Sequence, residues 1–442
     1  MLVIPNYTLR DENGPPTAPP IGPALVASSL RDEGYQVSMI DADAENLSDT
    51  ETVQRVIETN PDAIGFSCNY ISKHNPTIDL AKQIKKQADV FTFAGGNHIS
   101  AYTEPFLTSD KSLIDVVLKG EGEVNTPLLM RALSGKIGLE QVPGATINQN
   151  GRAVTLSHQQ YVDNLDSLSL PAYDLLPMDI YSRNMIISSR GCPFSCSYCA
   201  STCINGTKVR LRSAASIIDE INYTRSSFGD KFFWFSDDTF AAVKKHVTAI
   251  SLALTELENP IRWSCLANAA RLTDDTLAKM KNAGCEYLSI GVESTHPDHK
   301  KFIGKPINDE MVIDAVKKIH DNDMRAYGFF IIGFPGENEE TLESRYRLIE
   351  KARFDDVAVN LLILLPGTQL WDELVHKGLL DPETVDMDQF FARIKDDMDK
   401  SYSASMNEKW CDLTAEELLR GVEKCRELGK AASPEYRARV YD

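Results

Sequence analysis

Short apolar runs alternate with amphipathic stretches along roughly the first 135 residues of the chain. The expected strands are Met1–Ile4, Val37–Ile40, Ala63–Ser67, Val90–Ala94 and Ile114–Leu118. Between them, apolar side chains recur at helical spacing. This alternation is typical of βαβ units, so the sequence predicts a doubly wound, Rossmann-like α/β domain over residues 1–140. Ligands of such sheets bind at the carboxyl ends of the strands.

The same rhythm returns after residue 184. The expected strands are Phe232–Phe235, Arg262–Leu266, Tyr287–Val292, Ala326–Ile332 and Val357–Leu364, together with the apolar run before Cys192. About six βα units predict an incomplete, TIM-like (βα)6 barrel over residues 184–378. Residues 141–183 are expected to form a hairpin, turning at Asn150-Gly151, and a linker. Residues 379–442 are polar and are expected to form a small helical cap, with a helical pattern over Leu413–Leu428.

Composition narrows the class of protein. The 442 residues are 43% hydrophobic and 25% charged, which suits two or three globular domains. No apolar run approaches the length of about 18 residues that a membrane span needs. A net charge of −18 disfavours a nucleic-acid partner, because phosphates are neutralised by Lys and Arg. Nine cysteines, an odd number, favour a reducing, cytoplasmic location over a disulfide framework.

Three of those cysteines lie close together. Cys192, Cys196 and Cys199 have the spacing C-x3-C-x2-C, which suits a soft-metal centre such as a cuboidal iron–sulfur cluster. Three thiolates leave one iron of a cube open to substrate. A closed zinc site is the alternative, although zinc sites usually combine two separated C-x2-C pairs. Cys203 could add a fourth ligand and make an electron-transfer cluster, or it could be a small buried residue.

Each later strand is followed by a polar or glycine-rich sequence, and in barrels the chemistry lies on these loops. The endings are Ser236-Asp237-Asp238, Ala267-Asn268, Gly291-Val292-Glu293-Ser294, Gly333-Phe334-Pro335-Gly336-Glu337 and Pro366-Gly367-Thr368. Together with the cysteine spacing, their order resembles the radical S-adenosylmethionine (radical SAM) superfamily. The resemblance implies a 4Fe–4S cluster on Cys192, Cys196 and Cys199, whose open iron binds S-adenosylmethionine. Its reductive cleavage gives a 5′-deoxyadenosyl radical that abstracts hydrogen from substrate.

The resemblance also implies roles for individual positions around S-adenosylmethionine. Candidate contacts are Tyr198 near the adenine, Ser236, Asp237 and Asp238 at the amino group, Glu293 and Ser294 at the ribose, Lys305 at the carboxylate, and Gly333, Pro335 and Gly336 at the adenine. Asn268 and Arg271 are further candidates. The aspartates replace the usual Gly-Gly-Glu element, as is common in the subgroup that carries a cobalamin domain.

Loops of the first domain resemble the cobalamin-binding domain that precedes many radical SAM domains. The quoted sequences are Pro15-Pro16, Pro20-Ile21-Gly22, Gly95-Gly96-Asn97-His98 and Asp115–Glu123, which includes Gly120-Glu121-Gly122. Glycines at strand ends let a backbone approach a ligand closely. The D-x-H-x-x-G element that supplies histidine to cobalt is absent, although Asp11-Glu12-Asn13-Gly14 lies near its place. Cobalamin is therefore expected base-off with no histidine below cobalt, with His98 the histidine to examine; alternatively, the fold persists without the cofactor.

The resemblance implies a radical SAM enzyme that acts on a small molecule. The leading expectation is cobalamin-dependent methylation of an unactivated carbon, in which one S-adenosylmethionine methylates cobalt and another supplies the radical. The alternatives are a radical dehydratase, epimerase or oxidoreductase with a vestigial first domain, and a non-catalytic iron–sulfur protein. An external electron donor such as flavodoxin or ferredoxin is expected, without nucleic-acid or membrane partners.

Overall fold

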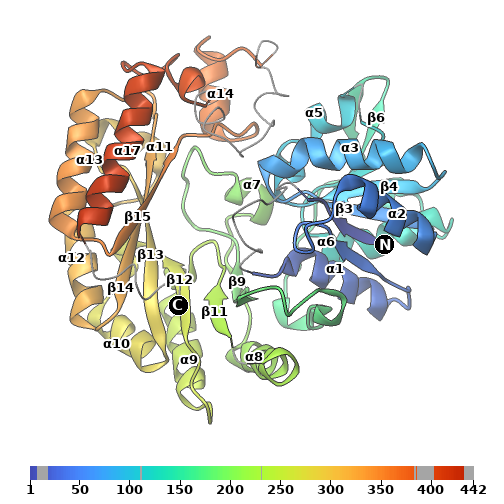
Figure 1. Ribbon diagram of the computed structural model, residues 1–442, viewed down its shortest axis with the longest axis horizontal. Coiled ribbons are helices and arrows are strands. Elements are labelled where there is room, and N and C mark those ends of the chain that lie inside the picture. The colour runs from blue at the N-terminus through green and yellow to red at the C-terminus, as the bar shows by residue number, and fades with distance from the viewer. Residues whose placement is uncertain (7–17, 110–111, 230, 383–384, 386–402, 433–442) are drawn as a thin grey trace.

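Two sheets, each built mainly of parallel strands, lie side by side in the molecule (Figure 1). The computed structural model describes residues 1–6, 18–109, 112–229, 231–382, 385 and 403–432. The turn-rich sequence around Asp11–Pro16 and most of the acidic sequence 381–399 lie outside these residues. Within the described part of the chain, no helix has the length and apolar character needed to cross a membrane.

The first sheet has the order β2-β1-β3-β4-β5-β6-β7. Its strands are β1 Leu2–Ile4, β2 Met39–Asp41, β3 Ala63–Ser67, β4 Phe91–Gly95, β5 Val116–Leu118, β6 Ala145–Gln149 and β7 Arg152–Thr155. The first five are parallel, while the β6–β7 hairpin adds antiparallel to β5. The order 2-1-3-4-5 is flavodoxin-like, and ligands of that fold bind where the strand order reverses, beside β1 and β3.

Helices cover both faces of this sheet. They are α1 Ile21–Asp32, α2 Asp49–Thr59, α3 His74–Lys85, α4 Asn97–Ala101, α5 Thr103–Thr108 and α6 Gly122–Leu133. Alternation along β1 sends Val3 into the core under α2 and α3, and Leu2 into the core under α1 and α6. The predicted doubly wound domain is confirmed.

The second sheet is a partial barrel with the sequential order β8-β11-β12-β13-β14-β15, all parallel. Its strands are β8 Arg183–Ile186, β11 Phe232–Phe235, β12 Trp263–Ala267, β13 Cys285–Glu293, β14 Arg325–Ile332 and β15 Asp356–Leu361, and a separate ribbon pairs β9 Ser189–Arg190 with β10 Arg210–Leu211. The outward faces of the barrel strands bury Phe233, Phe235 and Trp263 completely against the helices. The predicted (βα)6 architecture is confirmed.

Helices follow the strands of the second sheet. They are α7 Ser201–Asn205, α8 Ala214–Phe228, α9 Lys244–Thr255, α10 Asp274–Asn282, α11 Lys300–Ile303, α12 Asp309–Asp321, α13 Glu339–Ala352, α14 Gln369–His376 and α17 Ala415–Ala432. Helices α8, α9, α10, α12 and α13 cover the outside of this sheet (Figure 1). The C-terminal helix α17 packs on β15 and α13 (Figure 1), so it extends this outer layer. It accounts for the helical pattern expected over Leu413–Leu428.

Element boundaries differ from expectation by a few residues. Strand β5 begins at Val116 rather than Ile114, because the Asp115 carboxylate accepts the Thr92 N–H at 2.7 Å at the start of β4. Strand β15 ends at Leu361 rather than Leu364. Helix α3 begins at His74, directly after a 3-10 turn over Ile71–Lys73.

Candidate active site

The cysteine sequence forms a loop at the carboxyl edge of the barrel, between β9 and α7. Gly191 starts the loop with φ 92°, and a Cβ there would lie 2.4 Å from the Lys208 carbonyl oxygen. On the other side, the Ser197 N–H donates to the Phe302 carbonyl at 2.9 Å. Gly304 has φ 62°, and its added Cβ would lie 2.4 Å from the Ser195 carbonyl oxygen. Glycines at both places let the chain close tightly around the loop.

The three cysteine thiols are free and close enough to influence one another. Burial raises the pKa of the Cys196 thiol to about 11; the Cys199 and Cys192 thiols add to this effect, while Lys305 opposes it. The Ser201 N–H donates to the Cys199 sulfur at 3.4 Å. Three thiols on one loop with a cation beside them match the donor set of a cube held by three thiolates.

Cys203 lies apart from these three. It is on α7, is exposed, and its thiol donates to the Gly367 carbonyl oxygen at 3.2 Å. The expectation that Cys203 is a buried residue is therefore wrong. The short helix buries Ile204 instead.

Asp237 and Asp238, which follow β11, bind the segment around the cysteine loop. The Asp237 carboxylate is buried and accepts the N–H groups of Ser188 and Ser189 at 2.7 and 3.1 Å, and both of their hydroxyls. Burial raises the pKa of Asp237 to about 6, although these hydrogen bonds oppose the shift.

The Asp238 carboxylate joins the two ends of the loop. It accepts the Gly191 N–H at 3.0 Å, before the first cysteine, and the Ser201 hydroxyl, after the last one. Asn205 also donates to it at 3.1 Å. The neighbouring Ser236 lines a pocket between the domains. Both aspartates are thus engaged in holding the loop, a use that the resemblance did not indicate.

Glu293 and Lys305 form a buried pair next to the cysteines. The Lys305 amino group donates to Glu293 Oε1 and to the Gly291 carbonyl oxygen, each at 3.1 Å. Burial favours the neutral amine, but Glu293 and the Cys196 thiol outweigh it, so the pKa of Lys305 is raised. Glu293 has φ 63°, in the left-handed region. Such strain in a non-glycine residue is concentrated at functional sites.

Ser294 follows Glu293 directly in the chain. Its hydroxyl is 3.0 Å from Nδ1 of His299, a fully buried ring. Burial lowers the pKa of His299 to about 4, so the ring is neutral at pH 7.

The Gly333–Glu337 turn is held rigidly by residues far along the chain. The Trp410 indole N–H donates to the Gly333 carbonyl oxygen at 2.9 Å, and the Gly336 N–H donates to the Trp410 carbonyl oxygen at 2.9 Å. Glu337, fully buried, pairs with Arg345 at 3.2 Å. Pro335 lies within this turn.

The turn also meets the cysteine loop. The rings of Tyr198 and Phe334 pack edge to face at 5.4 Å between centroids. The two elements expected near the adenine are therefore brought together.

Asn268 and Arg271 follow β12. Asn268 is buried and its Oδ1 accepts the Ala270 N–H at 3.0 Å, whereas its Nδ2 has no hydrogen-bond partner among the described residues. A buried donor of this kind is costly unless a ligand satisfies it. Arg271 is exposed and lies 6.0 Å over the ring of Phe194 in the cysteine loop.

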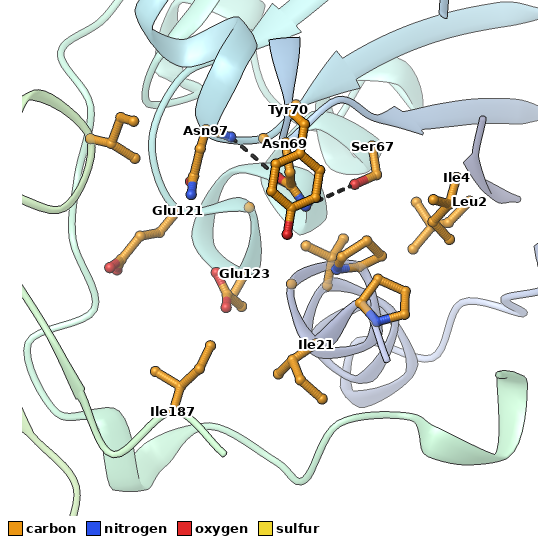
Figure 2. Close-up of a pocket in the computed structure, with 18 of the residues that line it drawn as sticks. Leu2, Ile4, Ile21, Ser67, Asn69, Tyr70, Asn97, Glu121, Glu123 and Ile187 are labelled. Atoms are coloured by element: carbon orange, nitrogen blue, oxygen red, sulfur yellow. Dashed lines mark hydrogen bonds between the residues drawn. The ribbon is translucent and has the colours of Figure 1, made fainter. Parts of the chain in front are cut away.

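A pocket of about 510 Å³ separates the cysteine-loop side of the barrel from the first sheet. Its first wall comes from the carboxyl ends of β3, β4 and β5, including Asn69, Tyr70 and Asn97 (Figure 2). The Asn97 N–H donates to the Asn69 side chain at 3.2 Å. The barrel supplies the opposite wall, including Arg190 and Ser236. Asn69 and Tyr70 were not expected, although they directly follow a predicted strand.

The glycine loops line this pocket, and their glycines also serve the protein's own packing. Gly95, Gly96, Gly120 and Gly122 all reach the pocket surface. A Cβ at Gly96, where φ is 116°, would lie 2.4 Å from the Asn69 side-chain oxygen. A Cβ at Gly122 would lie 2.6 Å from Val26 on α1. Bulky substitutions there would disturb the domain as well as any ligand.

His98 and Glu121 point to protein partners. Nε2 of His98 lies 2.9 Å from Nδ1 of His74, and its ring stacks on Tyr102. Burial lowers the pKa of His98 to about 4. Glu121 forms ion pairs with Arg190 at 3.2 Å and Arg210 at 2.8 Å. Both side chains are thus engaged by protein groups, and Glu121 also lines the pocket.

Comparison with known proteins matches each half of the chain to a family. The B12 binding domain family matches residues 12–129, and the Radical SAM superfamily matches residues 186–349. An uncharacterized methyltransferase of Pyrococcus horikoshii is 32% identical over 82% of this chain and 80% of its own length. The chain belongs to the radical SAM superfamily. Its subgroup carries a B12 binding domain ahead of the radical SAM domain.

Two further relatives extend the comparison of this radical SAM protein. The hopanoid C-3 methylase of Methylococcus capsulatus is 29% identical, over 80% of this chain and 68% of that enzyme. The fold matches the radical S-adenosylmethionine methyltransferase TsrM of Kitasatospora setae, solved with cobalamin and a 4Fe–4S cluster, with a TM-score of 0.72. That match covers 85% of this chain and 74% of TsrM at 16% identity.

Membership confirms several expectations. The protein is a radical SAM enzyme of the methyltransferase class, and its cofactors are a 4Fe–4S cluster, S-adenosylmethionine and cobalamin. The non-catalytic iron–sulfur reading is therefore set aside. The individual cofactor contacts remain predictions.

Proposed function

We propose that this radical SAM enzyme methylates an unactivated carbon of a small molecule, with cobalamin held in the pocket between its two domains. The observation that supports this most directly is that residues of both domains line the pocket. One wall consists of strand-end loops of the B12 binding domain, at the switch point where such folds bind ligands. The other includes Arg190, Ser236 and Asp238, which adjoin the cysteine loop.

Cys192, Cys196 and Cys199 would hold the cluster. When bound, the cluster and S-adenosylmethionine supply a 5′-deoxyadenosyl radical, and cobalamin carries the methyl group. Asp237 and Asp238 are positioning residues in this proposal, because their carboxylates hold the loop that bears the cysteines.

S-adenosylmethionine would lie beside the cysteine loop, against the Glu293–Lys305 pair. Lys305 offers a cation to a carboxylate, and Glu293 offers an acceptor to ribose hydroxyls. The buried Nδ2 of Asn268 offers one more donor. Tyr198 and Phe334 present an aromatic surface where the adenine is expected.

The electron required for the radical would come from an external donor such as flavodoxin or ferredoxin. In the expected reaction, His98 takes no part, because its ring is buried against His74. No histidine is among the described residues that line the pocket, so its described lining would hold cobalamin without a histidine ligand.

A product assay tests the proposal. Cluster-loaded enzyme with hydroxocobalamin, a low-potential reductant and S-adenosylmethionine should release S-adenosylhomocysteine, the product of methyl transfer. With a competent substrate it should also release 5′-deoxyadenosine. Formation of 5′-deoxyadenosine without S-adenosylhomocysteine would overturn methylation and favour dehydratase, epimerase or oxidoreductase chemistry.

A further inference from the structure

The cysteine loop and α7 lie between β9 and β10 in sequence. These two strands pair with each other, so the β9–β10 ribbon forms the base from which the cysteine loop projects. Arg190 on β9 and Arg210 on β10 are register partners on that ribbon. Arg190 lies two residues before Cys192. Any group that binds both arginines therefore fixes the base from which the cluster ligands project.

That group belongs to the B12 binding domain. Glu121 Oε1 lies 3.2 Å from Nη1 of Arg190 and 2.8 Å from Nη2 of Arg210. Glu123 Oε1 lies 2.5 Å from Nη2 of Arg190. The side chains of Arg190, Arg210, Glu121 and Glu123 are only 11%, 3%, 4% and 5% exposed. At this burial an ion pair is little screened by salt.

The charges in this cluster balance, and the two arginines favour the ionised form of Glu121 despite its burial. Burial works to raise the pKa of Glu121, but Arg210 and Arg190 outweigh it and hold the pKa below its usual value. Glu121 Oε2 also accepts the Val162 N–H at 2.6 Å. Removing one partner would leave another charge buried and unpaired, which is strongly destabilising.

Glu121 lies between Gly120 and Gly122, and this glycine loop lines the interdomain pocket together with Glu123 and Arg190. A ligand that fills the pocket therefore contacts the residues that fix the base of the cysteine loop. The barrel also holds this base, through Asp237 and Asp238. The ion pairs are thus a direct mechanical link from the glycine loop to the cysteine loop.

We propose that the Glu121–Glu123–Arg190–Arg210 cluster couples the two cofactor sites, so that the cluster-loaded enzyme binds cobalamin more tightly than the cluster-free enzyme. This inference rests on the proposed function, since it requires cobalamin in the interdomain pocket. Coupling between two sites is reciprocal: bound cobalamin must raise the protein's affinity for the iron–sulfur cluster by the same factor. Arg190 and Glu123 act here as positioning residues.

The test measures hydroxocobalamin binding by equilibrium dialysis, with the cluster present and after its removal by chelation. Wild-type affinity should differ about tenfold between the two states, within the usual range of such couplings. In the double variant Arg190→Met/Glu123→Gln, which removes one charge of each sign and leaves only the Glu121–Arg210 pair, the ratio should fall toward one. A merely stabilising role would lower the melting temperature but leave this ratio unchanged.

A surface ion pair provides the matched control. Arg31 on α1 and Asp174 in the linker pair at 2.8 Å and are both well exposed. The double variant Arg31→Met/Asp174→Asn should keep the wild-type ratio. If Arg190→Met/Glu123→Gln does not fold, Arg190→Lys serves instead: it keeps the charge but cannot bridge two carboxylates as a guanidinium does, so the ratio should shrink.

The outcomes separate the two proposals. No binding of hydroxocobalamin to either form of the wild type would overturn the proposed function and this coupling together. Equal wild-type affinities in the two states, or an unchanged ratio in the Arg190 variants, would overturn the coupling alone. In the reverse direction, hydroxocobalamin should slow iron release to a chelator in the wild type and not in the double variant.

Discussion

The barrel and the B12 binding domain both place their chemistry at the carboxyl ends of parallel strands, but they use those ends differently. In the barrel, the charged strand-end side chains bind the protein itself: Asp237 and Asp238 hold the cysteine loop, and Glu337 pairs with Arg345. In the first domain, Asn69 and Tyr70 lie open to the pocket. The carboxylates that follow β11 therefore hold the cysteine loop in place, whereas the end of β3 in the first domain leaves side chains open to a large ligand.

Substitution of the cysteines should have the largest effect and tests whether the loop held by the barrel carries the cluster. Cys192→Ala, Cys196→Ala and Cys199→Ala should each abolish 5′-deoxyadenosine formation, because each removes one of three thiolates from the cube. Cys203→Ser is the matched control and should keep both iron and activity, since that thiol contacts the Gly367 carbonyl oxygen. Iron loss in Cys203→Ser would make it a ligand and overturn the three-cysteine assignment.

Asp238→Ala should have the next largest effect, on both stability and iron content. It leaves the Gly191 N–H, the Ser201 hydroxyl and the Asn205 amide without their acceptor, at a cost of about 3 kcal/mol in the free energy of unfolding. Iron per chain after reconstitution should fall as the loop loosens. Asp275→Ala, which removes an exposed carboxylate on α10, should leave iron content unchanged. Full iron loading of Asp238→Ala would contradict the idea that strand-end carboxylates hold the loop.

Glu293→Gln should weaken S-adenosylmethionine binding by roughly ten- to hundredfold, the worth of about 1.5–3 kcal/mol for a charged hydrogen bond. The iron content should stay at the wild-type level, because the Glu293 carboxylate accepts a hydrogen bond from Lys305 and is not one of the expected cluster ligands. Isothermal titration of the cluster-loaded variant measures the affinity. Unchanged affinity here and in Lys305→Met would remove both residues from the S-adenosylmethionine site.

The raised pKa of Asp237 predicts a pH dependence of stability. Its pKa is about 6 in the folded chain, against about 3.9 when unfolded, so the folded state retains a proton that the unfolded state has lost. The free energy of unfolding of the wild type, relative to Asp237→Asn, should therefore fall as pH rises through this range. Between pH 5 and pH 7.5 the difference should shrink by about 1.4 kcal/mol. If the difference in the free energy of unfolding between wild type and Asp237→Asn is the same at pH 5 and at pH 7.5, the raised pKa of Asp237 is contradicted.

Periodicity and turn residues allowed much of the fold to be predicted. Ala63–Ser67 and Phe232–Phe235 form the expected strands, and the hairpin turns at Asn150-Gly151. The cysteine spacing located the loop. These features depend on neighbours in sequence, which is why reading along the chain finds them.

The partners of the charged side chains could not be predicted in this way. Asp237 and Asp238 stand where the family places contacts to S-adenosylmethionine, yet they bind a segment roughly fifty residues earlier. Glu121 binds Arg210, 89 residues away. Such pairings join segments that are far apart along the chain, and no local pattern encodes them. Asn69 and Tyr70, in contrast, could have been found, because they follow a predicted strand.

Substitution of Tyr70 should give the smallest effect. It tests whether the strand-end side chains of the first domain that lie open to the pocket contact the cofactor. The residue is 60% exposed at the pocket, where a bound cofactor would cover its ring (Figure 2). Tyr70→Ala should weaken hydroxocobalamin binding about fivefold through lost ring contact, with no change in melting temperature because the ring buries little in the free protein. Tyr70→Phe keeps the ring and should bind within about twofold of the wild type. Equal losses in both variants would mean that the hydroxyl, and not the ring, contacts the cofactor. If Tyr70→Ala binds hydroxocobalamin with wild-type affinity, the cofactor lies elsewhere in the pocket. The open side chain at the end of β3 would then have no part in binding the cofactor, and this contrast with the barrel would fail.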